Sequence, residues 1–177
     1  MKQSGDDRAM ALARLSDALR GTEVSSLPAA LVPAGGIELA YALSRAVLPE
    51  DVATVVLAAQ RPATPVFGVP NEAVRCLLTA RRFDARIRAT GVILNSIASE
   101  AVLDALLLQV CSYDRAREPA GISSMHWGVA GCCREGVPDA VVDRGAKGAE
   151  GLIRLFSEDP AGIARMISAI GSHLHAG

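Results

Sequence analysis

The spacing of hydrophobic positions predicts a helix near each end of the chain. Leu12, Leu15 and Leu19 recur at helical intervals within residues 6–20. Asp6 or Asp7 could cap this helix at its start, and Gly21 suits its end. Near the other end, the pair Asp159-Pro160 is typical of a helix start. The apolar stripe that continues this second helix to about residue 173 consists of Ile163, Met166, Ile167, Ile170 and Leu174.

Between these ends, short runs rich in β-branched residues alternate with longer helical patterns. The predicted strands are 53–59, 66–69 and 90–97, because such runs suit a half-buried or buried sheet. The predicted helices are 37–47, 71–83 with Asn71 as its N-cap, and a helix that begins at Ser99. The last of these, whose apolar part is residues 99–111, is apolar on almost every side. We therefore expect it to be buried in the domain or in a subunit interface.

This order of elements predicts an α/β fold. We expect one globular domain over residues 1–177, with a mainly parallel or mixed small sheet flanked by helices and with frayed ends at 1–5 and 175–177. Because the strands are short, an α+β arrangement is the alternative. No repeat or long linker divides the chain.

Composition narrows the class of protein. Hydrophobic residues make up 50% and aromatic residues only 3%, so the core must consist of small aliphatic side chains, and we expect a homo-oligomer that buries more apolar surface. With 18 basic and 19 acidic residues, nothing attracts the chain to nucleic acid or to an anionic membrane. The start of the chain does not resemble a secretory signal, and the four cysteines lack the spacing of a disulfide framework. We therefore expect a soluble cytoplasmic protein with reduced thiols.

The segment 121–151 holds the densest group of chemically active side chains. Adjacent Cys132 and Cys133 could supply a nucleophilic thiolate, with His126 as the proton partner and Asp139 or Asp143 orienting that histidine. The alternative is that both cysteines are packed core thiols, since free cysteine is often buried.

A glycine-rich stretch in the same segment is a candidate anion site. We expect Arg144, Gly145, Lys147 and Gly148 to bind an anionic ligand, with the single tryptophan, Trp127, in the same pocket. This interpretation assumes that the loop leads into a helix at the run LIRLF. The spacing matches neither the P-loop nor the dinucleotide-binding motif. A solvated surface loop is the alternative.

Metal ligation by His126, Cys132 and Cys133 is disfavoured, because adjacent cysteines rarely bind one tetrahedral ion, so no metal is predicted. The sequence indicates no particular cofactor. An arginine cluster, which could bind a small anion or form salt bridges, comprises Arg75, Arg81, Arg82, Arg86 and Arg88.

Three classes of function follow. The leading hypothesis is a small enzyme acting on a small anionic metabolite, with its site in segment 121–151 and a possible thiol dependence. The second is a non-catalytic ligand-binding or regulatory module that uses the same pocket. The third is an assembly protein whose apolar 99–111 helix forms the subunit interface.

Overall fold

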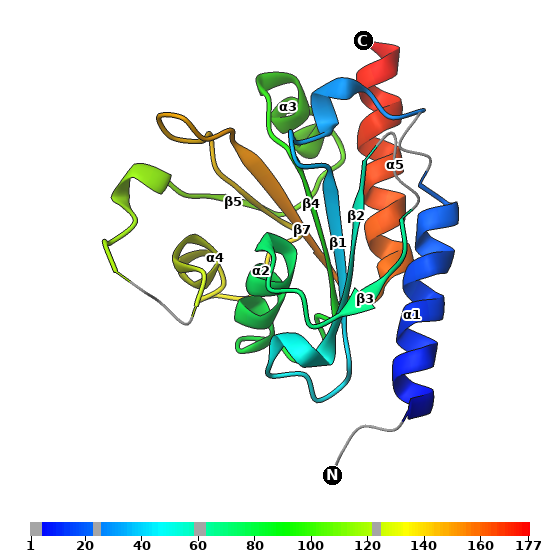
Figure 1. The fold of residues 1–177 in the computed structure, drawn as a ribbon. Helices are drawn as coiled ribbons and strands as arrows, with labels where there is room; N and C mark the ends of the chain where they lie inside the picture. Colours follow the sequence, from blue (N-terminus) through cyan, green and yellow to red (C-terminus); the bar gives the residue numbers. More distant parts are fainter. Residues whose placement is uncertain (1–4, 23–25, 59–62, 122–124) are drawn as a thin grey trace.

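The computed structural model describes residues 5–22, 26–58, 63–121 and 125–177, and its strands form one mixed sheet (Figure 1). The strands are β1 (Ile37–Ala42), β2 (Val52–Leu57), β3 (Val66–Phe67), β4 (Ala89–Leu94), β5 (Val110–Ser112), β6 (Ala140–Val142) and β7 (Leu152–Ser157). Their order across the sheet is β3-β2-β1-β4-β7-β6-β5. Neighbouring strands are antiparallel except for β5 and β6, which are parallel.

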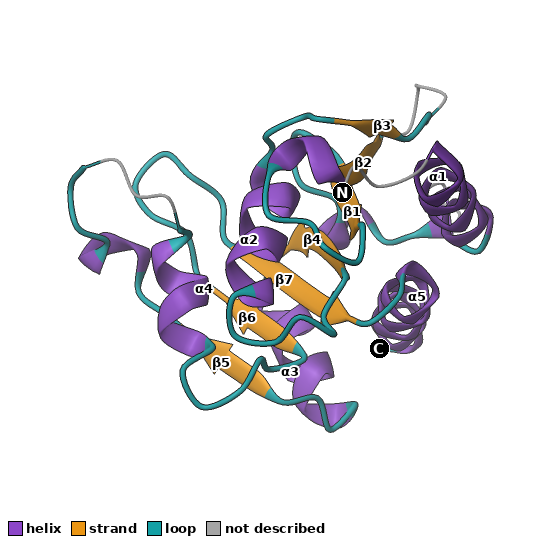
Figure 2. Ribbon diagram, turned by 90° about the horizontal axis from the view of Figure 1, so that it is seen from below, coloured by secondary structure: helices purple, strands orange, loops and turns teal. Residues whose placement is uncertain are grey.

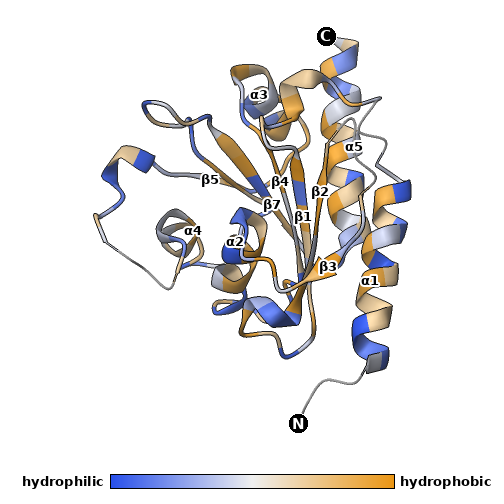
Figure 3. Cartoon of the chain, in the orientation of Figure 1, coloured by the Kyte–Doolittle hydropathy of each residue, from blue (hydrophilic) through white to orange (hydrophobic). Residues whose placement is uncertain are grey.

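Helices cover both faces of the sheet (Figure 2). In the described ranges, the α-helices are α1 (Gly5–Arg20), α2 (Glu72–Arg81), α3 (Ile97–Ala105), α4 (Trp127–Cys132) and α5 (Pro160–Ala176). Short 3-10 helices there include η2 (Ala29–Leu31), η3 (Pro49–Asp51) and η4 (Arg115–Arg117). α1, α3 and α5 lie on one face, and α2 and α4 on the other. The strands between them are mostly hydrophobic (Figure 3). None of the helices in the described ranges has the length and apolar character needed to cross a membrane.

The predicted α/β class is confirmed, and of the two sheet arrangements expected, the mixed one is observed. The terminal helices are confirmed, and Asp159 caps the second of them by accepting a hydrogen bond from the Gly162 amide. Asn71 likewise caps α2, where its side chain accepts from the Val74 amide. Local sequence decides these helix starts, because a capping side chain satisfies amides that have no partner within the helix.

Two predicted helices are wrong. Residues 37–47 begin with β1, which lies between β2 and β4 and is buried on both faces. A strand of this kind lacks the polar alternation of a half-exposed strand, so its apolar run resembles a helical stripe. The second error concerns residues 99–111, because α3 ends at Ala105 and Val110–Ser112 form the edge strand β5.

The structure also shows why α3 is short. It begins after Ser96, which together with Ser99 forms a capping box, and a left-handed residue, Leu107 with φ of 58°, follows its end. Ile97 and Leu107 are about nine-tenths exposed, and the residues of α3 that are buried are Ser99 and Leu103. The expectation that this helix is buried inside the domain is therefore wrong, whereas its alternative, burial in a subunit interface, stays a prediction.

Candidate functional site

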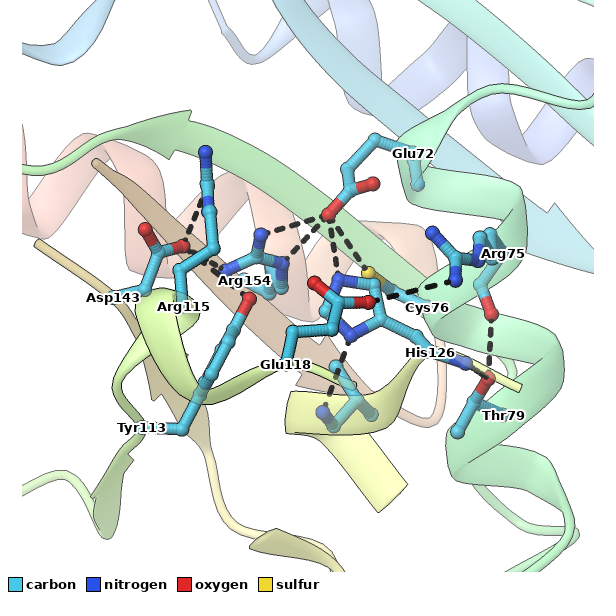
Figure 4. A network of polar contacts seen from close by, with 12 residues as sticks. Glu72, Arg75, Cys76, Thr79, Tyr113, Arg115, Glu118, His126, Asp143 and Arg154 are labelled. Carbon is cyan, nitrogen blue, oxygen red and sulfur yellow. Dashed lines mark hydrogen bonds and ion pairs between the residues drawn. The ribbon is translucent and has the colours of Figure 1, made fainter. Parts of the chain in front are cut away.

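A buried arginine, Arg154, is the centre of a polar network between the sheet and α2 (Figure 4). It projects from the middle of β7, and its side chain is 1% exposed. Its Nε and Nη2 donate to Glu72 Oε1 at 2.9 and 2.7 Å, and its Nη1 donates to Asp143 Oδ2 at 2.7 Å. A buried charge is stable only when it is paired, so these two carboxylates account for an arginine inside the sheet.

The fold brings these groups together from distant parts of the chain. Asp143 directly follows β6 and Tyr113 directly follows β5. Because β5 and β6 are parallel, their carboxyl ends meet at the same edge of the sheet and place the two side chains side by side. Glu72 is the first residue of α2, which packs over β7 on the same face.

The three charged groups stabilise one another's ionised forms. Burial alone would raise the pKa of Glu72, but a hydrogen bond from His126 and the charge of Arg154 hold it well below the usual range. Burial would also raise the pKa of Asp143, and its hydrogen bonds with Arg154 lower it instead. Burial would lower the pKa of Arg154, and the surrounding acidic groups keep it above its ordinary value. The network is therefore fully ionised at neutral pH.

His126 joins this network from the N-cap position of α4. Its Nδ1 accepts a hydrogen bond from the Val129 amide at 3.3 Å, which assigns the proton to Nε2, and Nε2 lies 2.9 Å from Glu72 Oε1. The His126 amide donates to Thr79 Oγ1 at 2.9 Å, which fixes the start of α4 on α2. The imidazole is thus held in one tautomer and one orientation.

Tyr113 forms the wall between this network and the start of α4. Its ring meets the His126 and Trp127 rings edge to face, with centroids 5.8 and 6.1 Å apart. Its hydroxyl lies 3.4 Å from Asp143 Oδ2, and burial raises its pKa above the ordinary value. The hydroxyl therefore stays protonated and donates to the carboxylate.

An open cavity of about 380 Å³ lies against the Asp143 side of the network. It is lined by residues 112–115 at the carboxyl end of β5 and residues 142–145 at the carboxyl end of β6. Arg115 donates to Asp143 Oδ2 at 2.8 Å, and its side chain is 20% exposed, so part of the guanidinium faces the cavity side. The cavity thus combines a cationic fork with the aromatic ring of Tyr113, a combination that suits an anionic group attached to a planar ring.

The structure separates the residues that the sequence grouped in segment 121–151, of which 122–124 lie outside the described residues. His126 and Asp143 join one network through Glu72 and Arg154. Asp139 precedes β6 rather than following it, and it accepts from the Gln109 amide at 2.8 Å. Asp139 and Asp143 are four residues apart along β6, which corresponds to roughly 13 Å in a strand. The two aspartates therefore lie at opposite ends of this strand.

Neither candidate thiol is a free, accessible nucleophile in this structure. Cys132 forms a disulfide with Cys111, so the expectation of four reduced thiols is wrong for this pair. Cys133 is a buried thiol, and burial raises its pKa to about 11. It packs in a small apolar cluster with Val129 and Phe156, in agreement with the alternative of a core thiol.

The glycine-rich loop leads into β7, so its interpretation as a helix start is wrong. It forms a hairpin in which Gly145, with φ of +82°, donates to Asp143 Oδ1 at 2.7 Å. A side chain at position 145 would collide with the backbone at Gly151, which explains the glycine. Arg144 and Gly145 line the cavity, whereas exposed Lys147 and Gly148 lie farther along the hairpin.

The arginine cluster divides into different roles. Arg81 is largely buried and donates to the carbonyls of Ser44, Ala85 and Ile87 at 2.8–2.9 Å, so it braces loops. Exposed Arg86 pairs with Asp84. Arg81 and Arg86 therefore make structural contacts within the protein, in agreement with the alternative to anion binding that the sequence offered for this cluster.

One group of side chains has the composition of a metal site. Ligand atoms of Glu72, Cys76 and His126 lie within 4.8 Å of one another. However, Arg154 already donates twice to the same Glu72 oxygen, and His126 Nδ1 accepts a backbone hydrogen bond. A metal on Nε2 would move the ring proton to Nδ1, so the hydrogen bond from the Val129 amide would be lost. The metal would also face the positive charge of Arg154, so the donor set fits the arginine better than a cation.

Sequence reasoning missed the residues that organise the site, namely Glu72, Tyr113, Arg115 and Arg154. One signal was present, because Arg154 interrupts the apolar run LIRLF. A charged residue within an otherwise buried strand needs a buried partner. The identity of that partner, Glu72, could not be read from the sequence, because it lies 82 positions away.

The fold and the network define a class of protein, an α/β domain with a buried carboxylate–arginine–carboxylate site at one edge of a mixed sheet. Residues 14–169 match the family model for thiamine-phosphate synthase ThiN, and the chain belongs to this family.

Related proteins agree with this assignment. The chain is 33% identical over 109 residues to the bifunctional thiamine biosynthesis protein ThiDN of Methanocaldococcus jannaschii, an alignment that covers 59% of this chain and 25% of that protein. The chain thus matches about a quarter of that relative's length. The crystal structure of the C-terminal domain of protein MJ0236 superposes with a TM-score of 0.81 at 25% identity, covering 95% of this chain and 97% of that domain. The C-terminal domain of a phosphomethylpyrimidine kinase shares the fold, with a TM-score of 0.75 at 22% identity and coverage of 92% and 99%.

Proposed function

We propose that this chain is a thiamine-phosphate synthase that joins a pyrimidine unit to a thiazole phosphate. The family match supports the reaction class. The observation that carries the placement of the site is the cavity beside the network, which is bordered by Arg115 and Tyr113 and closed at its base by Asp143. This proposal narrows the small anionic metabolite expected from the sequence to two phosphorylated heterocycles.

The structure of the product defines the chemistry. Thiamine phosphate consists of an aminopyrimidine linked through a methylene group to the nitrogen of a thiazolium ring that carries a phosphate ester. The thiazole nitrogen must therefore form a bond to the pyrimidine methylene carbon. The bond from that carbon to a leaving group breaks, and the leaving group keeps the electron pair. A diphosphate ester suits this step because diphosphate leaves as a stabilised anion.

The side chains around the cavity divide this task. Arg115, which lines the cavity and is partly exposed, binds phosphoryl oxygens. Arg144 on the opposite loop, which pairs with Glu100 at 3.1 Å, supplies a second guanidinium. Tyr113 packs against one of the heterocycles. His126, Glu72 and Arg154 are positioning residues, because their hydrogen bonds fix the orientation of Asp143 and of the start of α4.

No thiol takes part in this reaction, because the carbon–nitrogen bond needs no sulfur nucleophile and because Cys132 is bonded and Cys133 is buried. Lys147 is a further candidate for phosphate binding if the hairpin bends toward the cavity. A homo-oligomer, a cytoplasmic location and the lack of nucleic-acid or membrane partners stay part of the proposal.

The test is synthesis of thiamine phosphate by the purified chain. The protein is incubated with the pyrimidine methyl diphosphate and the thiazole phosphate, and the product is measured by oxidation to a fluorescent thiochrome. Product that depends on both substrates, and that decreases when Arg115 is changed to Met, would support the proposal. A folded protein that forms no product under conditions where a known synthase does would refute it.

A second function has specific support. The charged groups of the network are paired with one another, so none of them is a free acid or base, as a ligand-binding or regulatory module would allow. Such a module would bind thiamine phosphate without forming it. Calorimetric titration with thiamine phosphate therefore distinguishes the two, since tight binding without turnover favours the module.

A further inference from the structure

The disulfide between Cys111 and Cys132 closes the loop that carries half of the site. Cys111 lies in β5, Cys132 is the last residue of α4, and their Cα atoms are 5.7 Å apart. The two cysteines are 21 positions apart in the sequence, and the chain between them contributes Tyr113, Arg115 and His126. Figure 2 shows α4 beside the edge strand β5.

Both elements that the disulfide joins are weakly supported without it. β5 has three residues and pairs with β6 along one side, at the edge of the sheet. α4 has six residues, too few for a helix to be stable without tertiary contacts. A covalent link between them reduces the conformational freedom of the loop, so it favours the ordered arrangement of the site.

The described part of the loop makes an exposed contact with α2 and buried contacts with the polar network. Arg75 Nη2 lies 4.0 Å from a Glu118 oxygen and 3.4 Å from the Met125 carbonyl, with nearly half of the Arg75 side chain exposed. At its ends, the loop is held by the His126 amide on Thr79 and by the contact of Tyr113 with α4. The exposed Arg75 pair contributes little. The ion pair of Arg115 with Asp143 and the contact of His126 with Glu72 hold the loop on the network, and the disulfide adds a covalent constraint to these contacts.

The four cysteines differ in accessibility. Cys111 and Cys132 are half-buried, whereas Cys76 and Cys133 are fully buried free thiols whose pKa values are raised by burial. A small thiol can therefore approach the bonded pair but not the buried pair. The rate of thiol–disulfide exchange depends on this access.

We propose that Cys111 and Cys132 form a redox-sensitive modification site that controls substrate binding, an inference that rests on the proposed function for its activity readout. A dithiol reductant attacks one sulfur of the pair through its thiolate, forming a mixed disulfide and releasing the other cysteine as a thiolate that takes up a proton. The second thiol of the reductant then displaces the first cysteine. The reductant leaves as a disulfide, and the protein has gained two electrons and two protons.

In the dithiol form, the loop samples more conformations and the complete site is populated less. If one molecule in ten keeps the ordered site, the apparent affinity for substrate falls roughly tenfold. The Michaelis constant should therefore rise on reduction, while kcat changes less, because bound substrate selects the ordered loop.

The experiment compares the oxidised and dithiothreitol-reduced chain, with alkylation and mass spectrometry to verify the state of each cysteine. We expect a roughly tenfold higher Michaelis constant after reduction, reversed by reoxidation. Cys111→Ala and Cys132→Ala should each have the Michaelis constant of the reduced protein, and dithiothreitol should not change it further. Cys133→Ala is the matched control, because it changes the adjacent thiol, keeps the disulfide and should still respond.

A second readout separates this inference from the proposed function. Trp127 is the single tryptophan and lies at the start of α4 against Tyr113, so its fluorescence reports on the loop without substrates. If neither form makes thiamine phosphate but Trp127 emission shifts reversibly with redox state, the modification site stands and the synthase proposal fails. If Trp127 emission and the Michaelis constant are the same in both states, or if all four cysteines alkylate in the air-oxidised native protein, the inference is wrong.

Discussion

Glu72 Oε1 accepts two hydrogen bonds from Arg154, although the two residues are 82 positions apart in the chain. The same oxygen lies 2.9 Å from His126 Nε2. One carboxylate at the start of α2 therefore joins the central strand β7 to the short helix α4. The stability of the site depends on this relationship, and it leads to the first prediction.

Replacement of Arg154 by Met should destabilise the protein strongly. Glu72 and Asp143 would be left as carboxylates without their buried partner, and breaking a buried ion pair in this way costs about 3–5 kcal/mol. The free energy of unfolding from urea titration measures the effect. Arg86→Met, which removes an exposed ion pair, is the control and should change stability by less than about 0.5 kcal/mol. Equal effects of the two variants would contradict the central role of Arg154.

Stability should decrease when the pH falls below about 4. The pKa values of Glu72 and Asp143 are lower in the folded protein than their ordinary values of 4.5 and 3.8. As the pH falls, the two carboxylates are therefore protonated in the unfolded chain at a higher pH than in the folded protein. The free energy of unfolding decreases from about pH 4 downward, until the carboxylates are protonated in the folded protein as well. Urea unfolding between pH 2.5 and 7 measures the slope. The Glu72→Gln variant should be less stable at neutral pH, and its free energy of unfolding should depend less on pH. An unchanged pH dependence would contradict the lowered pKa of Glu72.

Replacement of Gly128 by Ala should disturb the site. A Cβ at this position would overlap the ring of Tyr113, so the ring or α4 must move, at about 1–3 kcal/mol. Gly131→Ala in the same helix is the matched control, since nothing lies within 4 Å of its Cβ and alanine favours helix. Unfolding free energy and Trp127 fluorescence report the outcome. Equal stability of the two variants would show that Tyr113 has room to move.

Replacement of Arg115 by Met should raise the Michaelis constant for a phosphorylated substrate. A hydrogen bond to a charged group contributes about 1.5–3 kcal/mol, equivalent to a roughly 10- to 100-fold change. Arg117→Met removes a neighbouring arginine whose side chain is 82% exposed and should have little effect. Steady-state kinetics of thiamine phosphate formation measure both. If the two variants behave alike, the phosphate does not bind at Arg115.

Local sequence information was sufficient for several elements. The caps Asn71 and Asp159 and the terminal amphipathic stripes are confirmed because a cap and a 3.6-residue stripe act within one or two turns. The predictions were wrong for segments whose structure depends on pairing with distant parts of the chain. Residues 37–42 form a strand because β2 and β4 pair with them on either side, and Val110–Ser112 form a strand because β6 lies beside them.

For the candidate site, too, part of the arrangement could be predicted from the sequence and part could not. The sequence indicated where reactive side chains are concentrated, and His126 and Asp143 do lie in one network. It could not indicate that Cys132 pairs with Cys111, or that Asp139 lies at the other end of β6 from Asp143. Adjacency in the chain does not determine which end of a strand a residue occupies, and strand ends decide which side chains meet.

The sequence by itself therefore determined the α/β class, the starts of α1, α2 and α5, and the region richest in chemistry, all of which depend on short-range patterns. Only the tertiary structure decided that Arg154 is the centre of the site and that Glu72 and Asp143 are its partners. The physical reason is that a buried charge can be neutralised by any carboxylate that the fold brings within about 3 Å. Which carboxylate comes that close depends on sheet order and helix packing, and these are properties of the whole chain.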